Sequence, residues 1–409
     1  MRFLILSAVI FSLFSCRQEP AELKSGFWRG VITLQEKELP FTFDVQRNGD
    51  SYLVYLHNSS EKILLDEISI QGDSVVMVMH IFDAELRAKV DGDRLQGTFF
   101  KNYAPETSLP FVATFGEHHR FTKNTELAAE QNFGGKYQIE FTTTKDKYPS
   151  VAIIEQNGND LTGTFLTPLG DYRYLEGSVI NGQLMLSTFD GNHAFLFVAS
   201  LSGDSIQGDF YSGKTTHETF AGVKNEGAKM PDPESLTFLK DGYDKIEFSF
   251  PDLQGSPVSS SDKRFNNQVV ILQIFGTWCP NCMDETRFLS HWYINNHHRG
   301  VEILGLAYER KSDFAYAVNR VNKMKEKLKV PYDFVIAGHE DKLEAAKTLP
   351  MLNKVIAFPT TIIIGRDGKV KHIYTGFEGP GTGVYYQQFK DRFNQHINEL
   401  LNEKLTSSR

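Results

Sequence analysis

The 409-residue chain is poor in cysteine and has no long basic block. Its three cysteines are too few for a fold held together by several disulfides. Lys and Arg total 43 against 51 Asp and Glu, which gives a formal net charge of -8. Without a long run of basic residues, the chain has nothing that could follow a phosphate backbone. The composition therefore argues against a disulfide scaffold and against nucleic acid as a partner.

An apolar run at the N-terminus predicts export. Arg2 precedes the apolar segment 3–14, which is too short for a permanent membrane span but has the length of a signal-peptide core. The run ends Leu-Phe-Ser-Cys at residues 13–16, which resembles a bacterial lipoprotein signal. The resemblance predicts a signal peptide over residues 1–15, a lipidated Cys16 that anchors the chain in a bacterial membrane, and a tether over 16–25. The predicted location is the periplasmic or outer-surface side of the cell envelope. An ordinary cleaved signal with an incidental cysteine is the alternative.

Two long segments share one pattern of short strands and turns. Alternating and aromatic-rich stretches lie between turn sequences such as Asn-Gly-Asp at 48–50 and Asn-Gly-Asn at 157–159, which are typical of antiparallel β-structure. The strongest correspondence joins DRLQGTFF at 93–100 with DSIQGDFY at 204–211. We predict two tandem antiparallel all-β domains, at residues 26–118 and 133–224. The alternative is that turn-rich β sequences look alike by chance.

After a predicted linker at residues 225–245, strands and helices alternate. The continuous apolar run 269–275 predicts a buried parallel strand, and a helix follows from about residue 279 to about 298. Further along we predict strands at 301–307 and 332–336, helices at 312–328, 341–349 and 385–401, and a β-hairpin over 360–374. This order predicts an α/β domain at residues 246–405.

Cys279 and Cys282 lie between the predicted strand and the predicted helix. Unpaired N–H groups and the dipole of a helix N-terminus stabilise a thiolate. We expect Cys279 to hold the exposed, attacking position and Cys282 to resolve the mixed disulfide that Cys279 forms. Zinc is the alternative for a Cys-x-x-Cys pair, but no second cysteine pair exists, and His291, His297 and His298 lie too far along the helix. We therefore predict a redox disulfide and no metal.

A second motif lies directly before the predicted hairpin, at Ala-Phe-Pro-Thr-Thr over 357–361. Together with the cysteine pair it resembles the thioredoxin-like superfamily. The resemblance implies a cis-proline at Pro359 facing the cysteines, beside backbone that pairs with the substrate. It also implies substrate-binding roles for three further residues, Trp278, Pro280 and Thr360. A trans proline that opens an edge strand is the alternative.

Within this superfamily the chain is most similar to the extracytoplasmic TlpA/ResA-like reductases. The similarity rests on Gly-Thr-Trp-Cys at 276–279 followed by Glu285, and it covers about residues 248–401. It implies that Glu285 moves protons to and from the cysteines; the alternative is a solvated helix carboxylate. The pair Pro280–Asn281 departs from the Glu–Pro type common in the family.

The resemblance implies a thiol-disulfide oxidoreductase that reduces disulfides in exported proteins, with cytochrome c maturation as one such setting. A membrane electron donor is implied as well, since the chain has no cofactor motif. Peroxide reduction is disfavoured because Gly276 stands where a peroxidatic loop needs threonine. The alternative function is an envelope binding or assembly module, in which the β domains act and the thioredoxin-like domain is a redox-controlled adaptor.

Overall fold

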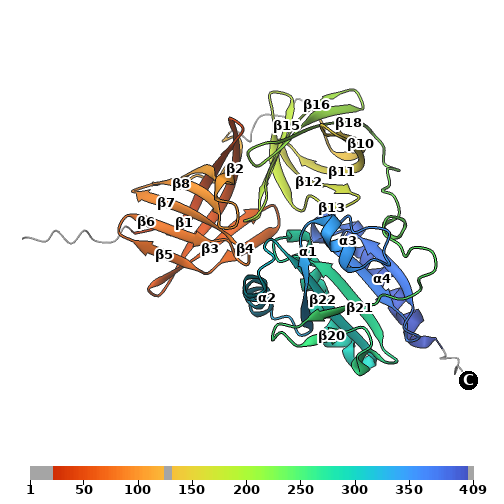
Figure 1. Ribbon diagram of the computed structural model, residues 1–409. Helices are drawn as coiled ribbons and strands as arrows, with labels where there is room; N and C mark the ends of the chain where they lie inside the picture. The colour runs from red at the N-terminus through yellow and green to blue at the C-terminus, as the bar shows by residue number, and fades with distance from the viewer. Residues whose placement is uncertain (1–21, 124–130, 404–409) are drawn as a thin grey trace, which may run out of the picture.

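The computed structural model describes residues 22–123 and 131–403, so the predicted signal peptide and Cys16 lie outside the described residues. The described chain is mostly β-sheet with a few helices. Figure 1 shows three units: a first β unit (residues 26–115), a second β unit (135–224) and a C-terminal unit (249–402). No helix within the described ranges is long and apolar enough to cross a membrane.

The first β unit is one nine-stranded antiparallel sheet in the order β4-β3-β2-β1-β9-β8-β7-β6-β5. Its first strand pairs with its last, whereas β4 and β5 stand at the two ends of the order. Gly49, Gly72 and Gly92 have positive φ at the predicted turns, a conformation that glycine adopts without steric cost. The strands are β1 (Gly26–Leu34), β2 (Lys37–Asn48), β3 (Ser51–Asn58), β4 (Glu61–Leu65), β5 (Ile68–Gln71), β6 (Ser74–Val78), β7 (Ala84–Asp91), β8 (Arg94–Lys101) and β9 (Leu109–Phe115).

The second β unit has the order β11-β10-β18-β17-β16-β15-β14-β12-β13. Here β11 also pairs with β12, so the sheet closes into a barrel. Its interior is a separate cluster of buried side chains rich in phenylalanine. The strands are β10 (Gly135–Thr142), β11 (Lys147–Asn157), β12 (Asp160–Thr167), β13 (Gly170–Asp171), β14 (Leu175–Ile180), β15 (Gln183–Phe189), β16 (Ala194–Ser202), β17 (Ser205–Ser212) and β18 (Thr216–Lys224).

The two Gln-Gly segments occupy equivalent places in the two β units. Strands β8 and β17 share one sequence of buried and exposed positions. A Cβ at Gly97 would lie 1.9 Å from a backbone oxygen of β7, and one at Gly208 would lie 2.3 Å from a backbone oxygen of β16. One cross-strand row recurs in both units: Ala88–Gly97–Phe111 and Ala199–Gly208–Phe220. These equivalences support the predicted tandem β domains.

The C-terminal unit contains a five-stranded sheet in the order β23-β22-β21-β24-β25. Its central strand β21, the predicted apolar run, is buried throughout, and it pairs parallel with β22 and antiparallel with β24. The elements are β19 (Ser249–Pro251), β20 (Pro257–Ser259), β21 (Val269–Phe275), α1 (Pro280–Asn296), β22 (Val301–Glu309), α2 (Phe314–Leu328), β23 (Asp333–His339), α3 (Lys342–Thr348), β24 (Thr360–Ile364), β25 (Val370–Thr375) and α4 (Val384–Asn402).

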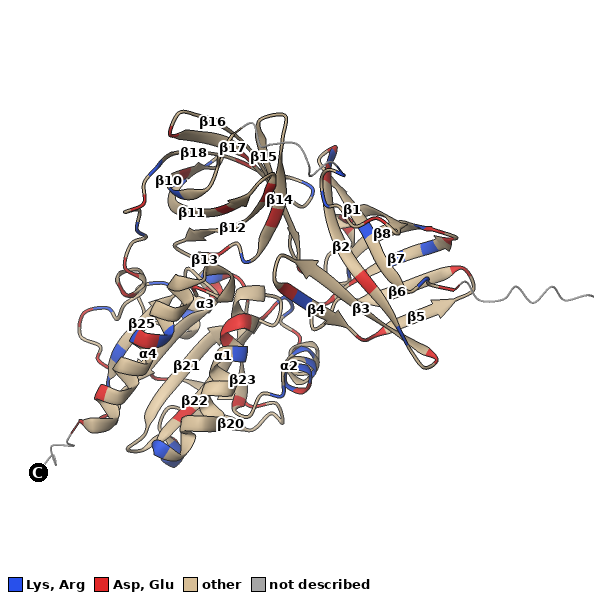
Figure 2. Cartoon of the chain, turned by 180° about the vertical axis from the view of Figure 1, so that it is seen from behind, with Lys and Arg blue, Asp and Glu red and all other residues tan. Residues whose placement is uncertain are grey.

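The first β unit packs firmly on the C-terminal unit. The two share one continuous apolar cluster, and Figure 2 shows the basic segments of α2 next to this β unit. Lys323 forms an ion pair with Glu67 at 2.9 Å, and Lys327 forms one with Asp66 at 2.6 Å. The second β unit is attached to the first through Arg120, which is 5% exposed and donates to the carbonyls of two strands. The first β unit therefore contacts both of the other units.

Candidate active site

The two cysteines begin helix α1, as the sequence predicts. Cys279 is the N-cap residue, and its Sγ accepts a hydrogen bond from the Cys282 backbone N–H at 3.2 Å. The Cys279 thiol donates to the carbonyl of Phe358 at 3.2 Å, and both cysteines are free thiols. Burial, followed by the hydrogen bond with Cys279, raises the pKa of the Cys282 thiol well above its usual value. Cys282 is therefore held as the protonated partner.

The expectation that Cys279 is exposed is wrong. Its side chain is only 6% exposed, and Cys282 is fully buried. Polar groups of the second β unit also bond the residues on both sides of Cys279. The Asn192 amide donates to the Trp278 carbonyl at 2.8 Å, and the Arg173 guanidinium donates to the Pro280 carbonyl at 2.9 Å.

Glu285 lies one turn after Cys282 on the side of α1 that faces the sheet. It is 1% exposed and accepts hydrogen bonds from Gln273 of β21 at 2.9 Å and from Thr361 of β24 at 2.6 Å. Burial raises the pKa of Glu285 to about 7, although the two hydrogen bonds oppose the shift. The alternative of a solvated helix carboxylate is thus excluded by its burial. A carboxyl group with this pKa can both accept and return a proton near neutral pH.

The predicted proline loop faces the cysteines. The Phe358–Pro359 peptide bond is cis, as the resemblance implies, and the Phe358 ring meets the Trp278 ring edge-on at 5.4 Å. Pro280 and Pro359 are buried. Thr360 is 0% exposed and donates its hydroxyl to the Ala357 carbonyl at 2.9 Å, so its role in substrate binding stays a prediction. Of the predicted substrate-binding residues, Trp278 alone is partly exposed.

Sequence reasoning missed a second buried carboxyl group, Glu309, at the end of β22. It accepts from the Thr277 backbone N–H and from the Thr277 hydroxyl, both at 2.8 Å, and so holds the backbone that leads into Trp278 and Cys279. Burial raises the pKa of Glu309 to about 7. A carboxylate directly after the apolar run 303–308 was the signal that could have found it.

Sequence reasoning also missed Arg173, which joins all three units. It lies after β13, is 4% exposed, and forms an ion pair with Asp284 of α1 at 2.6 Å. It also contacts Glu61 of β4 and lies 3.7 Å from Asp190. Although burial alone lowers the pKa of Arg173, these carboxylates, Asp284 foremost, produce a net rise. The guanidinium therefore stays charged in a buried network.

Asp171 makes a second set of contacts between the second β unit and α1. Its backbone carbonyl accepts from the Asn281 amide at 3.0 Å, and its carboxylate accepts from the Gly379 N–H at 2.7 Å. Burial raises the pKa of Asp171 to about 7. A Cβ at Gly170 would lie 2.7 Å from the Asn281 amide nitrogen. The β12–β13 turn therefore lies so close to α1 that a side chain at position 170 would clash with Asn281.

The first β unit contributes an aromatic group beside the same motif. The Arg310 guanidinium lies 4.6 Å from the Tyr103 ring centre and 4.5 Å from that of Trp278, an attractive cation–π arrangement. The Tyr103 hydroxyl also contacts Asn192 at 3.3 Å. Trp278 is thus the point at which the three units meet around the cysteines.

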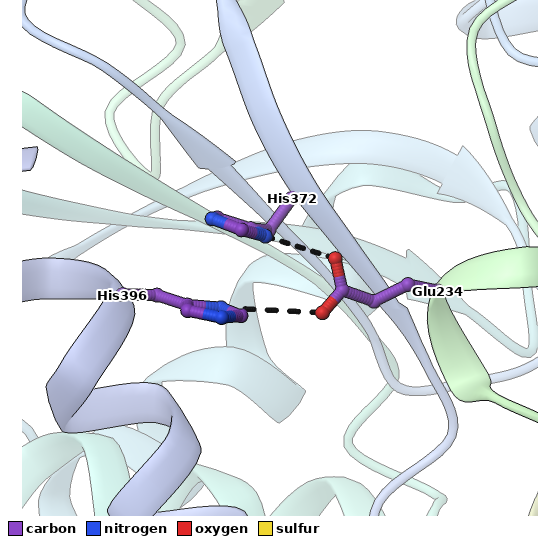
Figure 3. A group of neighbouring side chains, drawn as sticks. All are labelled: Glu234, His372 and His396. Carbon is purple, nitrogen blue, oxygen red and sulfur yellow. Dashed lines mark hydrogen bonds and ion pairs between the residues drawn. The ribbon is translucent and has the colours of Figure 1, made fainter. Parts of the chain in front are cut away.

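A cluster of potential metal ligands lies away from the cysteines and joins the linker to the C-terminal unit (Figure 3). Glu234 accepts from His372 of β25 at 2.9 Å and lies 3.9 Å from His396 of α4. Two histidines and a carboxylate form a set that zinc accepts. The two rings, however, stack at 3.7 Å with planes only 11° apart, so their in-plane lone pairs do not converge on one ion. The hydrogen bonding to Glu234 accounts for the cluster.

Comparisons with known proteins agree with the site. The family model described as Redoxin matches residues 226–388. The chain is 30% identical over 130 residues to the thiol-disulfide oxidoreductase ResA of Geobacillus thermodenitrificans. The matched region is 32% of this chain and 66% of that protein, slightly less than two thirds of its length. It is 25% identical over 138 residues to ResA of Bacillus subtilis, covering 34% and 69%.

Among solved structures, a thioredoxin-family thiol:disulfide interchange protein of Chlorobium tepidum is 19% identical and covers 40% of this chain and 100% of its own, with a TM-score of 0.31. The redoxin match and the ResA relatives do not support the alternative in which the β domains are the working part. The redoxin match over residues 226–388 and the ResA relatives therefore support a thioredoxin-like, TlpA/ResA-like C-terminal domain.

Proposed function

We propose that this protein is a thiol-disulfide oxidoreductase that reduces disulfides in exported proteins. The observation that carries the proposal is the free Cys279–Cys282 pair at the start of α1, with the titratable carboxyl group of Glu285 buried one turn further on. A helix N-terminus favours a thiolate at Cys279, whereas Cys282 needs a base because burial holds it as a thiol.

The reaction proceeds by two exchanges. The Cys279 thiolate attacks one sulfur of the substrate disulfide, which forms a mixed disulfide and releases the other substrate sulfur as a thiolate. Glu285 then takes the proton of Cys282, and the resulting thiolate attacks Cys279 Sγ. This breaks the mixed disulfide, frees the second substrate sulfur and leaves a Cys279–Cys282 disulfide. Two electrons pass to the substrate, so an external donor must reduce the pair again.

The positioning groups follow from the same geometry. Glu309 holds Thr277 and therefore the backbone leading to Cys279. Gln273 and Thr361 hold Glu285. Pro359 and Trp278 border the cysteines, and we assign them to substrate contact once the site is accessible.

We further propose an envelope location, with residues 1–15 removed, Cys16 lipidated and a membrane protein as electron donor. The proposed division is two β domains at 26–118 and 133–224, a linker at 225–245 and an α/β thioredoxin-like domain at 246–405. Replacing Cys16 by Ser should release the protein from the membrane fraction. Continued membrane association of that variant would contradict the anchor without touching the redox assignment.

The reduction potential of the cysteine pair tests the reaction. The protein is equilibrated with dithiol buffers and its free thiols are counted, with the Cys279→Ser, Cys282→Ser variant as the blank. A value near the thioredoxin end of the scale, about -270 mV, supports a reductase. A value near about -120 mV would make the protein an oxidant. Failure to form a reversible disulfide would remove the proposed function altogether.

A further inference from the structure

The surface that a polypeptide disulfide must reach is covered by this chain's own second β unit. Cys279 is 6% exposed, and Pro280 and Pro359 are buried. The covering contacts come from two short segments: Asp171 and Arg173 after β12, and Asn192 between β15 and β16. We call these three residues the clamp. They bond Trp278, Pro280, Asn281 and Asp284, which lie close to Cys279 in the sequence.

The contact between clamp and redox helix is polar. It consists of the Arg173–Asp284 ion pair and hydrogen bonds to the backbone or side chain of α1. Water and bulk ions can replace such partners, and a buried ion pair roughly balances its own desolvation. Polar interfaces between domains resemble transient ones. Arg173 also adopts φ of 57°, a left-handed conformation that non-glycine residues rarely hold without a specific contact.

The second β unit also has apolar attachments, beside the polar bonds of Arg120. Phe189, Ala194 and Leu196 pack into the apolar cluster that the first β unit shares with the C-terminal unit. Phe189 lies 4.6 Å from Phe41 and 4.9 Å from Phe99 of the first β unit, measured between ring centres. The remaining interior of the barrel is a separate core. The barrel therefore keeps its fold and its apolar attachment to the first β unit when the polar clamp opens.

We propose that the second β unit is a movable cover of the redox pair, and that a polypeptide disulfide reaches Cys279 only after the clamp has separated from α1. This inference rests on the proposed function for its substrate, and it assigns the regulation of that site. In the closed arrangement a small reagent reaches Cys279 far better than a bulky one.

Alkylation of Cys279 tests the cover directly. The full chain carries Cys16→Ser and Cys282→Ser, so that Cys279 is the only thiol. The rate of Cys279 alkylation is measured with iodoacetamide and with a bulky polyethylene-glycol maleimide. For each reagent, the rate in the folded protein is divided by the rate of the same reagent with the denatured protein. We expect a much lower ratio for the bulky reagent. Arg173→Ala and Asn192→Ala should each raise that ratio about tenfold, which corresponds to about 1.4 kcal/mol lost from the closed contact.

The matched control is Arg264→Ala, which removes an exposed ion pair with Asp333 inside the C-terminal unit. This variant should change neither ratio. Equal ratios for the two reagents, or a bulky-reagent ratio that the clamp variants leave unchanged, would overturn the proposal. If Arg173→Ala does not fold, Asn192→Ala still decides, because it removes only hydrogen bonds. Failure of the two-cysteine protein to reduce a small disulfide would count against the proposed function alone, since alkylation needs no redox turnover.

Discussion

The two sides of helix α1 differ in how they are built. On the inner side, toward the sheet, Glu285 accepts hydrogen bonds from two neutral partners of the C-terminal unit, Gln273 and Thr361. On the outer side, Asp284 faces the charged Arg173 from a different unit. The inner side therefore holds Glu285, whose pKa burial raises to about 7, and the outer side faces the guanidinium of Arg173, which stays charged. We infer that the inner face of α1 serves proton transfer, and that the outer face controls whether a substrate can reach Cys279.

The largest effect that would sharpen this comparison is expected from Cys282→Ser. The variant can still form a mixed disulfide at Cys279 but cannot resolve it, so turnover should fall to the uncatalysed background. Mass spectrometry should detect the trapped substrate adduct. The matched Cys279→Ser variant should be equally inactive and form no adduct. Sustained turnover by the Cys282→Ser variant would contradict the division of roles.

On the outer side, Arg173→Ala should lower the free energy of unfolding by about 3–5 kcal/mol, because it leaves buried carboxylates without their cation. The affected groups are Glu61 and Asp284. Chemical denaturation measures the change. Arg264→Ala, which breaks an exposed ion pair, should cost no more than about 1 kcal/mol. Similar losses in the two variants would mean that the buried network around Arg173 stabilises the fold no more than an exposed ion pair does.

Glu285→Gln changes the proton transfer on the inner side of α1 and leaves the clamp on the outer side unchanged. Because burial raises the pKa of Glu285 to about 7, the wild-type resolution rate should fall as the pH drops through about 7, where the carboxylate becomes protonated. The variant should be about a hundredfold slower at pH 8 and lack this inflection. Stopped-flow measurement of mixed-disulfide resolution checks both. Glu344→Gln, an exposed change in α3, should keep the wild-type profile; loss of the inflection there would refute the assignment.

Glu309→Gln probes stability against pH. The folded pKa of about 7 lies above the usual value of 4.5, so the folded protein binds the proton more tightly than the unfolded one. Its contribution is complete below about pH 4.5 and is lost as the pH rises through about 7. Between these limits the unfolding free energy of the wild type should fall by about 3 kcal/mol from this group, and the variant should lack this decline. An unchanged slope in thermal unfolding across this pH range would argue against the raised pKa.

The smallest expected effect belongs to Asn192→Ala, which removes the hydrogen bond to the Trp278 carbonyl. The unfolding free energy should fall by about 1 kcal/mol. Asn295→Ala serves as the control, because the Asn295 amide bonds to a carbonyl of its own helix. Denaturation midpoints compare the two. A loss several times larger in the Asn192 variant would show that the clamp also stabilises the whole chain.

Much of the inner side could be predicted from local sequence. The apolar run at 269–275 and the cysteines that follow it specify a strand and a helix start in sequence order. Helical spacing places Glu285 one turn after Cys282. The raised pKa of Glu285 could not be predicted, since it depends on burial beneath Gln273 and Thr361, which come from separate strands.

The outer side could not be predicted in this way. Arg173 and Asn192 stand in turn-rich segments of a β unit, where a polar residue is ordinarily solvated. Nothing in the spacing along the chain relates them to residues 278–284, roughly a hundred positions away. The error about the exposure of Cys279 has the same origin.

The sequence by itself determined the redox pair, the strand and helix that present it, and the repeated β pattern, because each depends on residues close together in the chain. Only the tertiary structure decided that one barrel closes while its counterpart stays open, that Glu285 and Glu309 are buried, and that groups of the second β unit bond the residues beside Cys279. These features arise from the packing of separate units, and packing brings together residues whose separation in sequence carries no periodic signal.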